Sequence, residues 1–197
     1  MSKDKISAAQ SVLISGHINP DGDSIGSLLA LGIGLKRMGK DVTMYVEKDL
    51  PRIYSFLPGN EDIVHSITTV PDIAVSVDCN TEEMLGEAKE YFRQAAYVIE
   101  IDHHEYRRPF GSFQWISPHV SCVGEMVYVL LRECDVEITA DISTNIMTSL
   151  IIESGAFRFP SVTAETFELC ARLMRSGVDY HDLISRLYMS RLRENVL

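Results

Sequence analysis

The sequence lacks three features that would place it in other classes of protein. It has no apolar run near the ~18 residues that a membrane-spanning helix requires. Its first ten residues are polar and contain no apolar core of a secretion signal. No Cys-x-x-Cys pair occurs, so the cysteines are expected to be scattered reduced thiols: Cys79, Cys122, Cys134 and Cys170. These absences predict a cytoplasmic protein with no membrane partner.

Basic charge is also scarce. The chain has 18 Lys and Arg against 28 Asp and Glu, which gives a formal net charge of −10. An acidic protein does not attract a polyanion through its overall field, so long duplex nucleic acid is not an expected partner. A short phosphate substrate remains open, because bound metal ions reverse the local sign of the charge.

The apolar pattern predicts an α/β fold in a single domain, which 197 residues can form. Between the expected strands lie a helix from Ile25 to Met38, stopped by Gly39, and one capped by Thr81 that runs to Phe92. The expected strands are 11–15, 42–46, 73–77, 97–101 and a short 113–116, and later helices lie near 122–133, 139–152, 163–176 and 179–190. This order predicts a mostly parallel sheet sandwiched by helices and followed by a helical C-terminal part.

Three of these strands end in charged residues. The first is followed by a loop with His17, Asp21 and Asp23; the third by Asp78; and the fourth by the triplet Asp102-His103-His104. Ligands of open α/β sheets bind beyond the carboxyl ends of the strands. The sequence therefore predicts that carboxylates and imidazoles converge at one edge of the sheet.

This set of residue types favours a divalent-metal centre. Carboxylates with a few imidazoles and no thiolate suit Mn²⁺, Fe²⁺ or Mg²⁺ rather than a structural zinc. Asp21, Asp23 and Asp78 together would repel one another strongly without cations. Two divalent ions would offset the repulsion, activate a water and polarise a phosphoryl oxygen.

Each residue also has an ordinary structural explanation. A single His17 would more often be a structural residue, and a single Asp21, Asp23 or Asp78 a turn or helix-cap residue. Convergence from three strand ends is what favours the metal centre. The remaining histidines have no such company and are interpreted as surface or loop residues, although the loop of His119 could approach the site: His65, His119 and His181.

With these residues in place, the chain resembles the DHH phosphoesterases, and most closely the branch of nanoRNase and pAp phosphatase enzymes. The first motif, His-x-x-Pro-Asp-x-Asp-Ser-x-Gly, is met from His17 to Gly26; Asp78 meets the second and Asp102-His103-His104 the third. The segments 56–59 and 188–191 also look like this branch. The resemblance implies a metal-dependent phosphoesterase, with two Mn²⁺ per site or Mg²⁺ in their place.

The resemblance also implies roles. His17, Asp21 and Asp78 would hold one metal. Asp23, Asp78, His103 and Glu153 would hold the other, with Asp78 bridging the two. Asp102 would orient an imidazole from behind the metals, and His104 would contact the scissile phosphate. Arg107 and Arg108, just beyond the triplet, could grip a phosphate, and a charged surface loop is an equal alternative.

Two departures from the family pattern stand out. The fourth motif is usually Asp-Thr-Gly-x-Phe, whereas residues 153–157 read Glu-Ser-Gly-Ala-Phe, so Glu153 would be a weakened ligand or a bystander. The family normally carries a C-terminal substrate-binding domain, and residues 191–197 would begin the linker to it, after a catalytic domain of residues 1–190. Gly22 weakly favours the nucleotide branch, because the family's pyrophosphatases tend to have Thr between the two aspartates.

Three functions are therefore compatible with the sequence. The chain would hydrolyse short oligoribonucleotides, dinucleotides of the pApA type or pAp. Alternatively, it would be an inorganic pyrophosphatase or exopolyphosphatase of the same superfamily. A third alternative is a metal-binding module with impaired catalysis. The sequence leaves the physiological substrate and the oligomeric state open, with a homodimer among the alternatives.

Overall fold

The computed structural model describes residues 2–189, whose six strands form one parallel sheet of order β3-β2-β1-β4-β5-β6. The strands are β1 (Ser11–Ser15), β2 (Asp41–Tyr45), β3 (Ile63–Val64), β4 (Ile73–Val77), β5 (Tyr97–Asp102) and β6 (Phe113–Ile116). The prediction of a mostly parallel sheet between helices is confirmed. Only β3 was not predicted, because two residues are too short for an alternating apolar pattern to be visible.

The order of the strands creates a crevice between β1 and β4. The chain leaves β1 toward β2 and β3 on one side, and then returns to β4 on the other side of β1. At such a reversal the connections after the two central strands diverge, which leaves room for a ligand beyond their carboxyl ends. The charged loops after β1, β4 and β5 meet at this edge.

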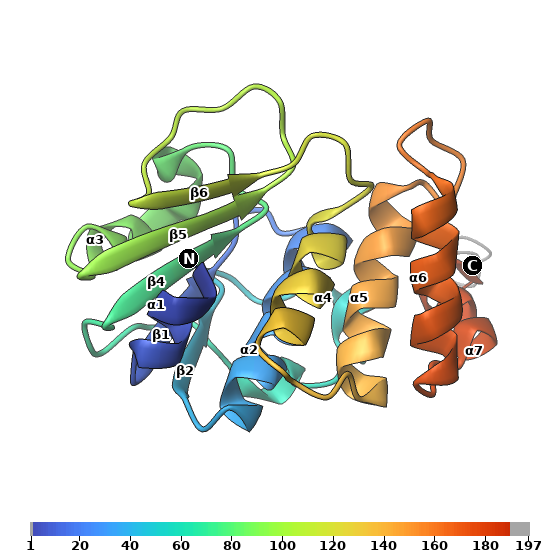
Figure 1. The fold of residues 1–197 in the computed structure, drawn as a ribbon, viewed down its shortest axis with the longest axis horizontal. Helices are drawn as coiled ribbons and strands as arrows, with labels where there is room; N and C mark the ends of the chain where they lie inside the picture. Colours follow the sequence, from blue (N-terminus) through green and yellow to red (C-terminus); the bar gives the residue numbers. More distant parts are fainter. Residues whose placement is uncertain (1, 190–197) are drawn as a thin grey trace, which may run out of the picture.

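Helices on one face of the sheet build outward in layers. The N-terminal α1 is Ser2–Ala8. The helices that follow on this face are α2 (Gly22–Arg37), α4 (Val123–Glu133), α5 (Ala140–Glu153), α6 (Ala164–Arg175) and the short α7 (Tyr180–Ile184), the last continued by a π-helical turn, Ser185–Met189. Figure 1 shows α2 and α4 beside the sheet, with α5, α6 and α7 successively farther away. The predicted helical C-terminal part is therefore present.

Glycines let α2 and α5 approach closely. A Cβ on Gly22 would collide with the side chain of Ile152, and one on Gly26 would collide with the backbone oxygen of Asn145. The two helices therefore pack at a distance that larger residues at these positions would not allow. As a result, the last turn of α5 lies beside the first turn of α2.

The other face of the sheet carries a short irregular cover. The predicted helix from Thr81 to Phe92 is instead a 3-10 segment, η3 (Glu82–Ala88), joined to one turn of α-helix, α3 (Lys89–Phe92). Gly86 breaks it, with φ 58° and ψ −131°, and the side chain of Thr81 makes no capping hydrogen bond. A second apolar cluster under this cover packs Leu85 and Phe92 against Leu13 of β1.

Some expectations fall outside the described residues. The segment 191–197, expected to begin a linker, lies there, as do the last two residues of the 188–191 segment that resembles the family. Among the helices of residues 2–189, none is long and apolar enough to cross a membrane. The four cysteines are free thiols, and Cys79, Cys122 and Cys170 are buried.

Candidate metal centre

Asp78 stands at the middle of the converging side chains. Its Oδ2 lies 3.6 Å from Nε2 of His17, and its Oδ1 lies 3.9 Å from Nε2 of His103. Oδ1 is also 3.7 Å from Nδ1 of His104. The two oxygens of one carboxylate thus face histidines from two different strand ends, β1 and β5.

The backbone conformation and the burial of Asp78 both cost free energy of folding. Its φ is +53°, in the left-handed region that favours glycine, and its N–H donates to the oxygen of Ile101 at 3.0 Å. The residue is 3% exposed. Burial, and then the charges of Asp23 and Asp21, raise the pKa of Asp78 well above its ordinary value. A nearby cation would stabilise the charged form of this carboxylate.

Asp21 has a structural and a chemical use at once. Its Oδ1 caps helix α2 by accepting hydrogen bonds from the backbone N–H groups of Asp23, at 2.9 Å, and Ser24, at 3.1 Å. The helix-cap interpretation therefore holds without excluding a metal role. Ligand atoms of Asp21, His17 and Asp78 lie within 4.8 Å of one another, as a bound cation requires.

Asp23 is fully buried and held by hydrogen bonds from two other helices. Its Oδ2 accepts from the N–H of Val123, which begins α4, at 2.9 Å. Its Oδ1 accepts from the hydroxyls of Ser27, at 3.0 Å, and Ser149, at 2.6 Å. Oδ2 lies 3.7 Å from Nε2 of His103. Burial raises the pKa of Asp23, and the start of α4 favours its negative charge.

Glu153 reaches the same imidazole from the end of α5. Its Oε1 lies 3.8 Å from Nε2 of His103, and its side chain is 34% exposed. Burial, and then the charge of Asp23, raise its pKa. The chain then turns sharply, because Gly155, Ala156 and Phe157 all have positive φ angles of 58° to 64°. The structure thus places Glu153, which stands where the family usually has Asp, next to the metal centre.

Asp102 orients His104. Its Oδ1 accepts from Nδ1–H of His104 at 2.8 Å and from the backbone N–H of His103 at 2.8 Å. This bond fixes the ring and leaves Nε2 free for another partner. The hydrogen bond that His104 donates to Asp102 raises the pKa of His104 to about 9. Burial alone would raise the pKa of Asp102, but the hydrogen bond and charge of His104 and the charge of Arg107 keep it low.

Arg107 lies behind this pair rather than in front of it. Its guanidinium forms an ion pair with Glu100, and its Nε lies 3.4 Å from Oδ2 of Asp102. The side chain is only 8% exposed, and that of Glu100 is fully buried. Because its charge is neutralised here by a buried partner, the structure favours neither of the two alternatives for Arg107, a phosphate contact or a charged surface loop. The structure favours instead a line of contacts from Glu100 through Arg107 and Asp102 to His104.

Glu100 is the residue that sequence reasoning missed. It lies inside the apolar strand β5, where an unpartnered charge would be strongly disfavoured. Its Oε1 accepts from the backbone N–H of Phe110 at 2.9 Å and from that of Gly111. A glutamate between Ile99 and Ile101 was itself the available signal that a buried cation lies nearby.

The other predicted polar residues lie at the surface. Arg108 is exposed and pairs with Glu83 at 3.1 Å, which leaves the phosphate-contact and surface-loop interpretations both open for it. The three histidines interpreted as surface or loop residues are exposed: His65, His119 and His181. His65 Nδ1 hydrogen-bonds the oxygen of Val46 at 2.8 Å.

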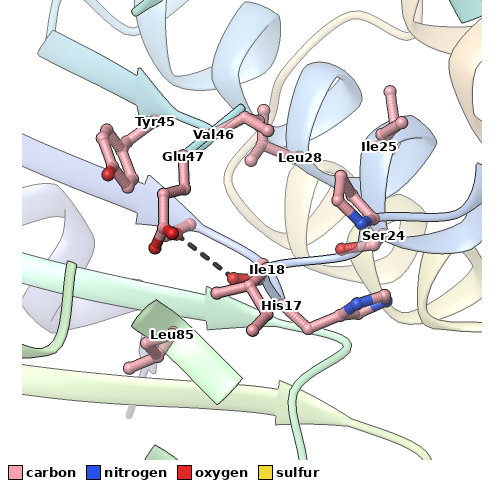
Figure 2. Close-up of a pocket in the computed structure, with 12 residues that line it drawn as sticks. His17, Ile18, Ser24, Ile25, Leu28, Tyr45, Val46, Glu47 and Leu85 are labelled. Carbon is pink, nitrogen blue, oxygen red and sulfur yellow. Dashed lines mark hydrogen bonds between the residues drawn. The ribbon is translucent and has the colours of Figure 1, made fainter. Parts of the chain in front are cut away.

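A small, mainly apolar cavity lies under the loop after β1. Figure 2 shows Ile18, Leu28 and Leu85 around it, with His17 on the loop beside it. The N–H of Ile18 donates to the oxygen of Met84 at 2.8 Å, which ties the loop to η3. An apolar cavity does not stabilise a phosphate, so we interpret this packing as support for His17.

The donor set as a whole fits divalent cations. Two groups of side chains could each hold an ion, His17 with Asp21 and Asp78, and Asp78 with His103 and His104, and Asp78 belongs to both. Buried carboxylates with raised pKa values are the environment in which divalent charge is most stabilising. Oxygen and imidazole donors without thiolate suit Mn²⁺ or Mg²⁺.

Comparisons with known proteins agree with this geometry. Residues 11–152 match the DHH family, N-terminal domain. The chain is 35% identical to the bifunctional oligoribonuclease and PAP phosphatase NrnA of Thermus thermophilus, over 89% of this chain and 53% of that protein. It is 29% identical to a probable manganese-dependent inorganic pyrophosphatase of an Exiguobacterium species, over 85% and 56%. The structure of an exopolyphosphatase-related protein from Bacteroides fragilis superposes with a TM-score of 0.89 at 25% identity, over 98% and 61%.

The chain spans little more than half the length of the curated relatives it matches, 53% to 60% of the first four. The matched part contains every residue of the candidate metal centre up to Asp102-His103-His104. Glu153 directly follows it.

Proposed function

Because the chain belongs to the DHH family, we propose that it is a metal-dependent phosphoesterase that hydrolyses short oligoribonucleotides, dinucleotides of the pApA type or pAp. The observation that carries the proposal is the position of Asp78, one of whose oxygens lies near His17 and the other near His103. That arrangement is expected of a carboxylate that bridges two cations.

We propose Mn²⁺ as the cofactor, with Mg²⁺ as a substitute, because relatives are named manganese-dependent. One ion would be held by His17, Asp21 and Asp78, and the other by Asp23, Asp78, His103 and Glu153. When bound, two such ions supply a nucleophilic water at neutral pH and polarise a phosphoryl oxygen.

The residues of the chain itself position the phosphate. Asp102 holds Nδ1 of His104, so Nε2 remains as a donor for a phosphoryl oxygen. Arg107 lies behind Asp102, and its charge adds to the hydrogen bond and charge of His104 in lowering the pKa of that carboxyl. Arg108 is exposed on the same loop and pairs with Glu83 at 3.1 Å, so a substrate phosphate would have to displace Glu83 to bind it.

Gly22 favours the nucleotide substrates only weakly. It packs against Ile152, where a Cβ would collide, so helix packing also favours glycine between Asp21 and Asp23. The choice between a nucleotide and pyrophosphate is therefore left to the activity test.

The test is Mn²⁺-dependent hydrolysis of pApA, pAp and pyrophosphate by residues 1–197, with the Asp78→Asn variant as control. We expect release of AMP from pApA, with a high KM because the relatives contain further sequence that could enclose the substrate. Turnover of pyrophosphate alone would support the pyrophosphatase alternative. Metal binding with no turnover of any of the three would support an impaired metal-binding module.

A further inference from the structure

We propose that Tyr106 forms a nucleobase-stacking subsite at the rim of the metal centre, which selects nucleoside phosphates over inorganic ones. The inference rests on the proposed function and names the substrate class of the same site. Tyr106 is 85% exposed, more than any other large hydrophobic side chain in the described part of the chain. The exposed ring is accessible to a ligand, and its backbone lies two residues beyond His104.

The position of Tyr106 is fixed by the residues around it. It follows His104 by two residues, so their Cα atoms are at most about 7.6 Å apart. Its backbone oxygen accepts from Nδ2 of Asn80 at 3.4 Å, and Asn80 follows Asp78 by two residues. Tyr106 is therefore attached to the strand ends of both β4 and β5.

The loop that carries the ring is held in place although it contains no helix. Figure 1 shows the connection from β5 to β6 as a long arc above the sheet. On the C-terminal side of Tyr106, Arg107 is buried in its ion pairs with Glu100 and Asp102. The N–H of Arg108 donates to the oxygen of Asn80 at 2.9 Å. A ring on such a loop loses little conformational entropy when a ligand binds.

The chemistry around the ring points to a base rather than to a further phosphate. Arg107 is neutralised by Glu100 and Asp102, Arg108 pairs with Glu83, and Glu105 next to the ring is exposed. These groups offer little net positive charge for a second anion. A planar aromatic face, in contrast, stacks on any base through its π system. Inorganic pyrophosphate has no group that could use it.

Binding of two probes to the Mg²⁺-loaded chain tests the subsite without requiring turnover. The probes are AMP and ribose 5-phosphate, which share the phosphate and the sugar and differ in the base. We expect AMP to bind the parent chain about tenfold more tightly in an NMR titration. Tyr106→Ala should remove most of that preference, and Tyr106→Phe should keep it.

Two controls separate stacking from a general disturbance. Phe167→Ala removes another exposed ring, on α6, and should leave the preference for AMP unchanged. Ribose 5-phosphate should bind Tyr106→Ala as it binds the parent chain, since its phosphate contacts remain. An unchanged preference for AMP in Tyr106→Ala would overturn the inference, as would equal binding, or no binding, of both probes by the parent chain. Loss of hydrolysis with the preference intact would instead count against the proposed function alone.

Discussion

The metal centre has two halves that are built differently. Asp78 and Asp102, at the ends of two neighbouring strands, are buried and fixed by the register of the parallel sheet. Glu153 comes from the end of a helix, is one-third exposed and is followed by three residues with positive φ. The sheet therefore fixes the positions of the strand-end residues, which form one half of the centre. The position of Glu153, the helix-end half, depends instead on how α5 packs against α2.

The largest effect should come from Asp78→Asn, at the centre of the strand-end half. Hydrolysis should fall more than about a hundredfold, since even partners that only orient metal ligands are worth ~10–100-fold. The metal-free chain should become more heat-stable. The folded pKa of Asp78 is raised, so above the unfolded pKa its charge destabilises the fold, increasingly as pH rises toward the folded pKa.

Asp72→Asn is the matched control, for which we expect the opposite change in the stability of the metal-free chain. Asp72 accepts hydrogen bonds from the N–H groups of Ser11 and Gln10, at 2.8 Å each, which lower its pKa. Its charge therefore stabilises the fold above the unfolded pKa, and that stability is lost as pH falls through the folded pKa. Melting temperatures at neutral pH without metal should rise for Asp78→Asn and fall for Asp72→Asn. A lower melting temperature in both variants would contradict the conclusion that the buried charge of Asp78 destabilises the metal-free fold.

Next in size is Arg107→Met, which tests the support behind the strand-end half. It leaves Glu100 buried and unpaired, so stability in urea should drop by about 3–5 kcal/mol. Turnover should fall ~10–100-fold through loss of the Asp102 contact. Adding Glu100→Gln should recover stability but not kcat. Recovery of both would mean that Arg107 acts only on the fold.

Variants of Glu153 address the helix-end half, and we expect a smaller effect there. If the longer side chain holds the second metal imperfectly, Glu153→Asp should tighten Mn²⁺ binding or raise turnover, and Glu153→Ala should weaken both. Titration of Mn²⁺ by calorimetry would measure this. If both variants bind Mn²⁺ as the parent chain does, Glu153 is not a metal ligand, and the strand-end residues alone form the site.

Arg108→Ala should have the smallest effect on the fold. Its pair with Glu83 is exposed, so the change in unfolding free energy should stay within about 1 kcal/mol. If Arg108 contacts the substrate phosphate, KM for pApA should rise while kcat changes little. An unchanged KM would favour the surface-loop interpretation.

Much of the sheet was predictable because buried parallel strands have continuous apolar runs. The strands at 11–15, 73–77 and 113–116 have the predicted bounds. The segment after Thr81 was mispredicted because Gly86 adopts a positive φ close to Glu47 and Ile18, and no local pattern shows that contact. The convergence at the strand ends was predictable from topology alone.

The partners of the site residues were harder to predict. Two of the hydrogen bonds to Asp23 come from Val123 and Ser149, about a hundred residues or more away in the chain. Arg107 was expected either to grip a phosphate or to lie in a charged surface loop, and only the position of Glu100 inside β5 shows why it turns inward. Such long-range pairings depend on the folded arrangement of helices and strands, which periodicity does not encode.

The close contact of α2 and α5 has a consequence for how the centre could be re-engineered. Gly22 and Gly26 carry no chemistry, yet they set the distance from which Glu153 reaches toward His103. A methyl group at Gly26 would press α5 outward, and the carboxylate would retreat with its backbone. The distance from the carboxylate of residue 153 to His103 therefore depends both on the length of the acidic side chain and on the separation of α2 and α5. A designer who shortens Glu153 must not also move the two helices apart.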